Sequence, residues 1–273
     1  MPYFEELIEV ANVNIYCKYS LSEKPPLFLI HGFASSSYTF NRLYPLLEKH
    51  FSVIAIDLPG FGRSEKSTSF QYSFKNYAQL IAECIDHFNL DRVFIVGHSM
   101  GGQIALYTAK AIPEKVSKLI LLCSSGYLKK AKRALVCCSY LPFFQYFVER
   151  FVKKKEVEAY LQNVFYDKSL ITDKHIEEFG KPLQEKAFYT SLISLLRYRE
   201  GDLTSEQLKM INLPTLLIWG KEDTVVPVYV GKKLVSDLSN SQLVTYKKTG
   251  HLITEERPNE VFEQILTYTK MYN

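Results

Sequence analysis

Ser99 lies between two glycines in the segment VFIVGHSMGGQIALYTA, residues 93–109. The segment begins with an apolar run that predicts a buried strand and continues with the pattern of a helix. A serine hydroxyl is a weak nucleophile at neutral pH. It needs a base to accept its proton and donors to hold the oxyanion that its attack creates. A tight strand-to-helix turn projects the side chain beyond the sheet, so the G-x-S-x-G pattern of residues 97–101 predicts a nucleophilic serine.

An acid and a histidine follow Ser99 in the chain, each just after a further apolar run. Asp223 follows PTLLIWG, and His251 follows QLVTYKKTG. We expect His251 to be the base, and the Asp223 carboxylate to orient its ring and stabilise the charged imidazolium. Glu222 is an alternative acid, and Asp223 would also suit the N-cap of the next helix. We favour Asp223 as the acid.

Two backbone amides are expected to form the oxyanion hole. One is the N–H of Met100, directly after the nucleophile, and the other is the N–H of Phe33, in the loop after HG. His31 is expected to brace that loop, and His98 to pack under the serine turn. The remaining histidines lie in helical patterns as surface or core residues: His50, His87 and His175.

Apolar runs and helical patterns alternate along most of the chain. A hairpin is expected over residues 7–20, with its turn near Ala11 and Asn12, and strands at residues 26–32, 53–56, 93–98, 118–123, 216–219 and 242–251. Helices are expected at residues 38–50, 74–88, 101–112, 226–238 and 258–271. Near-continuous apolar strands that alternate with helices predict a mostly parallel sheet covered on both faces.

In such sheets the functional residues lie beyond the carboxyl ends of the strands. The polar residues found at those ends are His31, Asp57, Ser99, Asp223 and His251. The alternation is interrupted only at residues 126–205, where helical periodicity is rich in aromatic and charged residues. We therefore predict a core of residues 1–125 and 206–273 and a helical cap inserted at 126–205. The whole excess of positive charge, +4, falls within this cap.

The motifs LFLIHGF, VIAIDLPGFGRS, VGHSMGG, LPTLLIWGKEDTVVP and GHLITEERP occur in this order along the chain. Together they resemble the α/β-hydrolase superfamily, over nearly the whole chain except the cap. The resemblance implies the α/β class, with an eight-stranded, mostly parallel sheet and helices on both faces. It also implies that the helical cap is inserted after the strand at 118–123 and closes over Ser99.

The serine nucleophile narrows the reactions that the resemblance implies. Haloalkane dehalogenases and epoxide hydrolases of this superfamily carry aspartate in place of Ser99. We expect a serine hydrolase that cleaves a carboxylic ester with an apolar portion, without a metal or an organic cofactor. An alternative is the carbon–carbon hydrolases of ring-cleavage pathways. These carry a Gly-rich HGSGPG-like loop, an Asn before the serine and a Trp after the histidine, where this chain has HGFASSS, His98 and Leu252. An acyltransferase and a non-catalytic binding protein are further alternatives.

Composition and sequence pattern bear on the partners and the cellular location of the protein. A net charge of +4 does not by itself suggest nucleic-acid binding. The acidic start of the chain does not resemble a signal peptide, and no apolar run is long enough to span a membrane. The five cysteines show neither a disulfide framework nor a zinc motif. A cytoplasmic location is therefore expected. Cys137 and Cys138 are expected to pack as small apolar side chains.

The cap suggests two kinds of partner beyond a small ester. Between two basic clusters, Leu141, Phe144, Val148 and Phe151 recur at helical spacing, with Phe143 and Phe147 alongside. The simplest interpretation is an amphipathic helix that covers the core and lines the pocket. One alternative is that the basic edge binds an acyl carrier protein, as in a carboxylesterase of similar architecture that cleaves a carrier-bound methyl ester. Another is that it contacts a phospholipid surface. The basic residues are Lys129, Lys130, Lys132, Arg133, Arg150, Lys153, Lys154 and Lys155.

Overall fold

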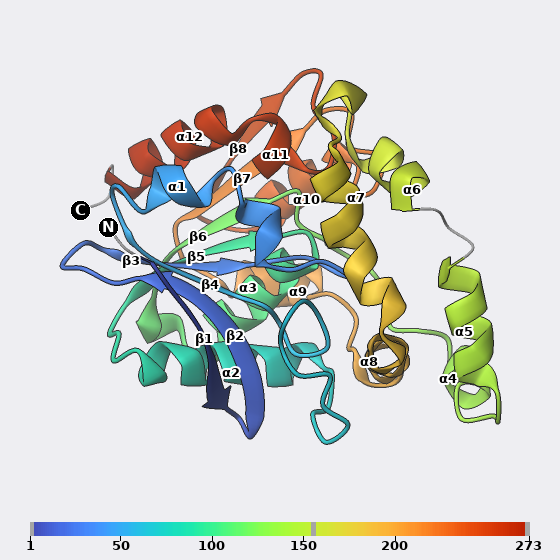
Figure 1. Cartoon of the computed structure of the whole chain (residues 1–273). Helices are drawn as coiled ribbons and strands as arrows, with labels where there is room; N and C mark the ends of the chain where they lie inside the picture. Colours follow the sequence, from blue (N-terminus) through green and yellow to red (C-terminus); the bar gives the residue numbers. More distant parts are fainter. Residues whose placement is uncertain (1–2, 154–156, 271–273) are drawn as a thin grey trace.

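A computed structural model describes residues 3–153 and 157–270 of the chain (Figure 1). Eight strands form one sheet in the order β1-β2-β4-β3-β5-β6-β7-β8. Their bounds are β1 Phe4–Val10, β2 Val13–Ser20, β3 Pro26–Ile30, β4 Ser52–Ile56, β5 Val93–His98, β6 Val116–Leu122, β7 Thr215–Gly220 and β8 Ser241–Tyr246. The prediction of an eight-stranded, mostly parallel sheet is therefore confirmed.

The first two strands form the antiparallel edge of the sheet. β1 pairs with β2, and β2 pairs with β4, both antiparallel, whereas every later pairing is parallel. Ala11 and Asn12 both have positive φ, 53° and 57°. Two consecutive left-handed residues make the tight turn that best joins antiparallel strands, and the expected hairpin is confirmed.

The register of the parallel strands brings their carboxyl ends to one edge of the sheet. Ile30 of β3 is opposite Gly97 of β5, and Leu122 of β6 is opposite both His98 and Ile218. Every residue of β4, β5 and β7 is buried. Helices on both faces bury these strands, which explains their continuous apolar runs. The loops that follow β3, β5, β6 and β7 consequently converge.

Helices cover both faces of the sheet. Figure 1 shows α12 and α1 over one face and α2 and α3 over the other. The bounds of the helices around the sheet are α1 Tyr44–Leu47, α2 Phe74–His87, α3 Met100–Ala111, α10 Val228–Asp237, α11 Ile253–Glu256 and α12 Pro258–Lys270. The single helix expected at residues 38–50 is wrong. A 3-10 turn at Ser37–Phe40 and the short α1 replace it, and α1 restarts with Pro45 in its first turn.

Between β6 and β7 the described residues form helices and loops without a strand. The helices are α4 Arg133–Cys138, α5 Phe144–Lys153, α6 Val157–Val164, α7 Asp173–Gly180, α8 Lys186–Tyr198 and α9 Ser205–Lys209. In Figure 1, α4 and α5 stand farthest from the sheet, at the right of the view. We call the described helices α4 to α8 the cap; its exact bounds stay a prediction. Among residues 3–153 and 157–270, no helix combines the length and apolarity needed to cross a bilayer.

Candidate active site

Ser99 occupies the sharp turn between β5 and α3. Its backbone has φ 54° and ψ −120°, a conformation that side-chain-bearing residues seldom adopt. The turn is held from both sides, because the N–H of Ser99 donates to Leu122 O at 3.0 Å and its carbonyl accepts from Gly102 N and Ser125 N at 3.0 Å each. Strained residues persist only where the surroundings determine them, and they cluster at functional sites. The turn expected from residues 97–101 is therefore present.

The turn requires glycine at positions 97 and 101, because backbone atoms pack directly against both residues. A Cβ on Gly97 would lie 2.6 Å from the carbonyl carbon of Gly101. A Cβ on Gly101 would collide with the carbonyl oxygen of Ile30 and lie 2.5 Å from that of His31. These atoms are backbone and cannot swing aside, so the turn tolerates no larger residue.

Gly101→Ala should therefore destabilise the fold. We expect a loss of about 2 kcal/mol in the free energy of unfolding, seen as a fall of about 4–8 °C in Tm by differential scanning calorimetry. Gly180→Ala is the matched control. The new methyl group there would meet only Val157 Cγ2, at an ordinary 3.6 Å. Equal melting temperatures for the two variants would contradict this account of the turn.

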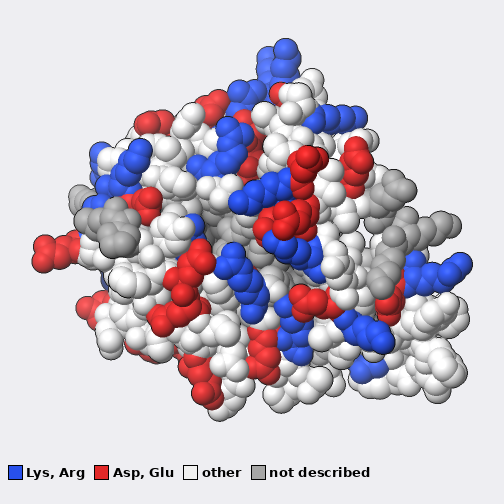
Figure 2. All heavy atoms as spheres, in the orientation of Figure 1, with Lys and Arg blue, Asp and Glu red and all other residues white. Residues whose placement is uncertain are grey.

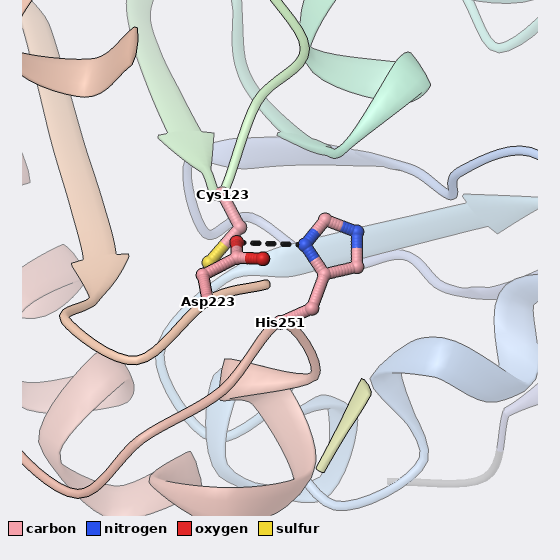
Figure 3. A group of neighbouring side chains, drawn as sticks. All are labelled: Cys123, Asp223 and His251. Carbon is pink, nitrogen blue, oxygen red and sulfur yellow. Dashed lines mark hydrogen bonds and ion pairs between the residues drawn. The ribbon is translucent and has the colours of Figure 1, made fainter. Parts of the chain in front are cut away.

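His251 and Asp223 meet beyond the ends of the strands, although 28 residues separate them (Figure 3). His251 Nδ1 lies 2.8 Å from Asp223 Oδ2, and both side chains are buried. The other carboxylate oxygen, Oδ1, accepts from Val225 N and Val226 N, each at 2.8 Å. One oxygen of Asp223 thus stabilises the turn that contains Val225 and Val226, and the other orients the ring of His251. The alternative acid Glu222 is exposed and accepts from Thr249 N at 3.0 Å.

The cap holds the His251 loop in place. The N–H of His251 donates to Val164 O at the end of α6, at 2.8 Å. Glu256 ties the same regions together, because its carboxylate accepts from Gly250 N at 2.7 Å and from Tyr166 N and Asp167 N at 3.1 and 3.0 Å. Burial raises the pKa of Glu256, against the effect of these donors. The sequence analysis missed Glu256, although it stands in the motif GHLITEERP.

Two buried histidines support the site as neutral groups. His98 Nε2 donates to His251 O at 2.9 Å, and the rings of these two residues are 4.8 Å apart. Burial, with the nearby His251, lowers the pKa of His98 to about 3, so its ring is neutral at physiological pH. His31 Nδ1 lies 2.7 Å from Gly32 O, and Leu58 N donates to His31 Nε2 at 2.9 Å. Both therefore serve as the expected supports of the loops.

The other polar candidates lie apart from this pair. Asp57 accepts from Ser37 N at 2.6 Å and Arg63 N at 2.7 Å, and so stabilises two loops. His175 is buried and lies 3.3 Å from Glu255 Oε2, while His50 and His87 are exposed. Cys137 and Cys138 are also exposed, so the expectation that they pack as small apolar residues is wrong. Helix α4, which contains them, buries none of its residues.

Cys123 is a neighbour of the pair that the sequence analysis did not single out. It follows β6, has φ 44°, and brings its Sγ within 4.8 Å of the ligand atoms of Asp223 and His251 (Figure 3). Three such residues are a possible metal set. However, burial raises the pKa of the Cys123 thiol well above its usual range, and the carboxylate of Asp223 is already bound by N–H groups. Both carboxylate oxygens of Asp223 are engaged, Oδ1 by Val225 N and Val226 N and Oδ2 by His251, and this suits a hydrogen-bonded pair better than a metal centre.

A cavity of about 450 Å³ lies beside Ser99. This volume falls within the range of small-molecule sites. Met100 and Phe33, whose amides are the expected oxyanion donors, both line it. Met100 begins α3, so its N–H belongs to the first turn, where helix amides lack intrahelical acceptors. Most of the remaining lining is apolar: Phe74, Leu128, Ala131, Leu192, Leu195, Leu196, Val225 and Val226, with Ser125 and Arg199.

The fold and this arrangement together define a hydrolase of the α/β class. Residues 25–258 match the α/β hydrolase fold family, and the chain belongs to that family. The resemblance inferred from the sequence motifs is thus confirmed.

The chain is similar to several proteins whose names describe them as hydrolases or lipid-cleaving enzymes. The chain is 43% identical to the uncharacterised hydrolase YugF of Bacillus subtilis, over 96% of both chains. It is 27% identical to 2-hydroxy-6-oxononadienedioate/2-hydroxy-6-oxononatrienedioate hydrolase 1 of Pseudomonas putida, over 94% of this chain and 92% of that one. A solved structure of a membrane phospholipase A is 28% identical, with a TM-score of 0.79, over 98% of this chain and 86% of the other.

Proposed function

We propose that the protein is a serine hydrolase that cleaves a carboxylic ester with an apolar acyl or alkyl portion. In this reaction Ser99 Oγ attacks the carbonyl carbon while His251 Nε2 takes its proton. The N–H groups of Met100 and Phe33 hold the oxyanion. His251 then returns the proton to the leaving alcohol. Water, activated by the same ring, attacks the acyl-enzyme, which releases the acid and restores Ser99.

The buried Asp223–His251 hydrogen bond of 2.8 Å is the observation that carries the proposal. It occupies Nδ1 and leaves Nε2 as the nitrogen able to exchange a proton with a nucleophile. The hydrogen bond from His98 places the backbone of His251 beside the turn that contains Ser99. A non-catalytic binding protein has no need for such a set, and this argues for an enzyme.

The cavity supports an apolar ester as substrate. Its lining is dominated by Leu, Val and Phe side chains, and the polar lining residues are Ser99, Ser125 and Arg199. Similarity to the phospholipase structure is consistent with ester cleavage. The similarity to the Pseudomonas putida hydrolase favours a second candidate, cleavage of a carbon–carbon bond in a ring-cleavage product. Both reactions would use Ser99 and His251, so the two candidates are distinguished by measuring turnover of an ester and of a ring-cleavage product.

A series of p-nitrophenyl esters from acetate to palmitate tests the proposal. We expect kcat/KM to peak at an acyl chain of about four to eight carbons, because the cavity limits the apolar length that it can enclose. Measured release of p-nitrophenol at each chain length, with the protein confirmed folded by circular dichroism, is the assay. Turnover of a ring-cleavage dienoate with no turnover of any ester would contradict ester hydrolysis.

A further inference from the structure

Helix α5 has two apolar stripes, and only one of them faces the protein. Phe144, Val148 and Val152 are partly buried, and the two valines pack against the main core. The second stripe is offset by one residue and faces solvent. Its side chains are among the most exposed large apolar groups described: Phe143 at 80%, with Phe147 and Phe151 at 65% each. The sequence pattern alone predicted a helix with one apolar face toward the core.

Further exposed apolar residues extend this stripe. Leu141 precedes α5 and Tyr146 lies on it, and both are exposed. We call Leu141, Phe143, Tyr146, Phe147 and Phe151 the outer cap face. Monomeric proteins rarely expose contiguous apolar surface of this kind unless it is an interaction site.

Basic side chains border the outer cap face. Exposed Lys130, Lys132 and Arg133 lie before and at the start of α4, and Arg150 lies on α5. In residues 127–153 the only acidic residue is Glu149. Figure 2 shows the region over α4 and α5, at lower right, as largely uncharged with Lys and Arg at its margins. Lys154 and Lys155, which belong to the same basic cluster in sequence, lie outside the described residues.

We propose that the outer cap face docks on the surface of an anionic lipid bilayer and delivers an ester from that bilayer to the cavity beside Ser99. Aromatic and leucine side chains enter the boundary of the acyl chains, and the surrounding Lys and Arg side chains bind the anionic headgroups. The delivery of substrate rests on the proposed ester hydrolysis, whereas the docking itself does not.

The charge pattern favours a bilayer over protein partners. A second copy of the chain would bring the same basic residues face to face, and like charges repel. An acidic carrier protein would complement Lys130, Lys132 and Arg133. It would also need an apolar groove for Phe143 and Phe147, whereas a bilayer supplies both an apolar layer and anionic headgroups.

The cap contributes residues to both the outer cap face and the cavity beside Ser99. Leu128 and Ala131 line the cavity beside Ser99 and precede α4, whereas the outer cap face follows α4. The segment before α4 also carries exposed Lys130 and Lys132, so apolar and basic side chains alternate between the cavity and α4.

Co-sedimentation with vesicles tests the docking. The wild-type protein should bind vesicles of phosphatidylcholine mixed with phosphatidylglycerol, and binding should fall as NaCl rises from about 0.05 to about 0.5 M. The triple variant Phe143→Ser, Phe147→Ser, Phe151→Ser should bind at least about tenfold more weakly. The variant Lys130→Ala, Lys132→Ala, Arg133→Ala should lose the preference for anionic vesicles over pure phosphatidylcholine, a change of about tenfold or more.

Matched controls separate docking from general surface apolarity and from catalysis. The double variant Met210→Ser, Tyr229→Ser removes side chains that are 74% and 68% exposed on other parts of the molecule, and it should bind vesicles like the wild type. Hydrolysis of a water-soluble p-nitrophenyl ester should be unchanged in the triple phenylalanine variant. Vesicle binding without any ester turnover would refute the ester hydrolysis alone.

Three results would overturn the docking proposal. One is wild-type protein that fails to bind either kind of vesicle at low salt. Another is a triple phenylalanine variant that binds as well as the wild type. The third is a wild-type dimer, seen by light scattering, that the phenylalanine substitutions convert to monomer, because the face would then be an interface between two copies.

Discussion

Ser99→Ala should lower kcat for p-nitrophenyl ester hydrolysis by about 10⁶-fold, to the level left by binding and oxyanion stabilisation alone. The substitution removes the only atom proposed to bond to the substrate carbonyl. It leaves the turn intact, because alanine adopts φ 54° at much the same cost as serine and the backbone hydrogen bonds of residue 99 remain. We therefore expect a wild-type circular dichroism spectrum and a closely similar Tm.

A fluorophosphonate probe gives an independent measure of the same residue. It should label the wild-type protein, and should label neither the heat-denatured protein nor the Ser99→Ala variant. Activation of the hydroxyl requires the folded arrangement around His251. A folded Ser99→Ala variant that still hydrolyses esters near the wild-type rate would remove Ser99 from the mechanism.

Asp223→Asn should have the second largest effect, a fall of about 10⁴-fold in kcat with KM little changed. The 2.8 Å contact joins Asp223 Oδ2 to His251 Nδ1. An asparagine that keeps its carbonyl oxygen toward the backbone N–H groups of Val225 and Val226 would present its NH₂ to that nitrogen. Nδ1 would then have to accept, which places the proton on Nε2 and prevents that nitrogen from acting as the base.

Glu222→Gln is the matched control for this prediction. Glu222 is adjacent in sequence and carries the same type of group, but it contacts the backbone of Thr249 and not His251. Its substitution should leave kcat close to the wild-type value. Steady-state kinetics of both variants, measured at one pH with Tm recorded, decide between the carboxylates. A larger loss in Glu222→Gln than in Asp223→Asn would reverse the assignment of the acid.

The parts of the protein that depend on local pattern could be predicted from its amino-acid sequence. Apolar runs predicted the sheet, because strands that are buried on both faces need continuous hydrophobicity. The residues of 97–101 predicted the turn at Ser99, because only glycines fit where Gly101 meets the backbone of Ile30 and His31. Asp223 was preferred to Glu222 as the acid after the apolar run PTLLIWG, and in the structure Asp223 contacts His251.

Which groups from distant segments meet depends on the packing of the whole chain. Cys123 and Glu256 carry no local signal of their neighbours. The first lies beside Asp223 and His251, and the second joins Gly250 to the cap. The orientation of α5 was equally hidden, because helical spacing identifies apolar positions on a helix but not which of them pack against the core. Burial of one stripe and exposure of the other follow from where α8 and the core lie. That placement depends on long-range packing, which the local pattern does not encode.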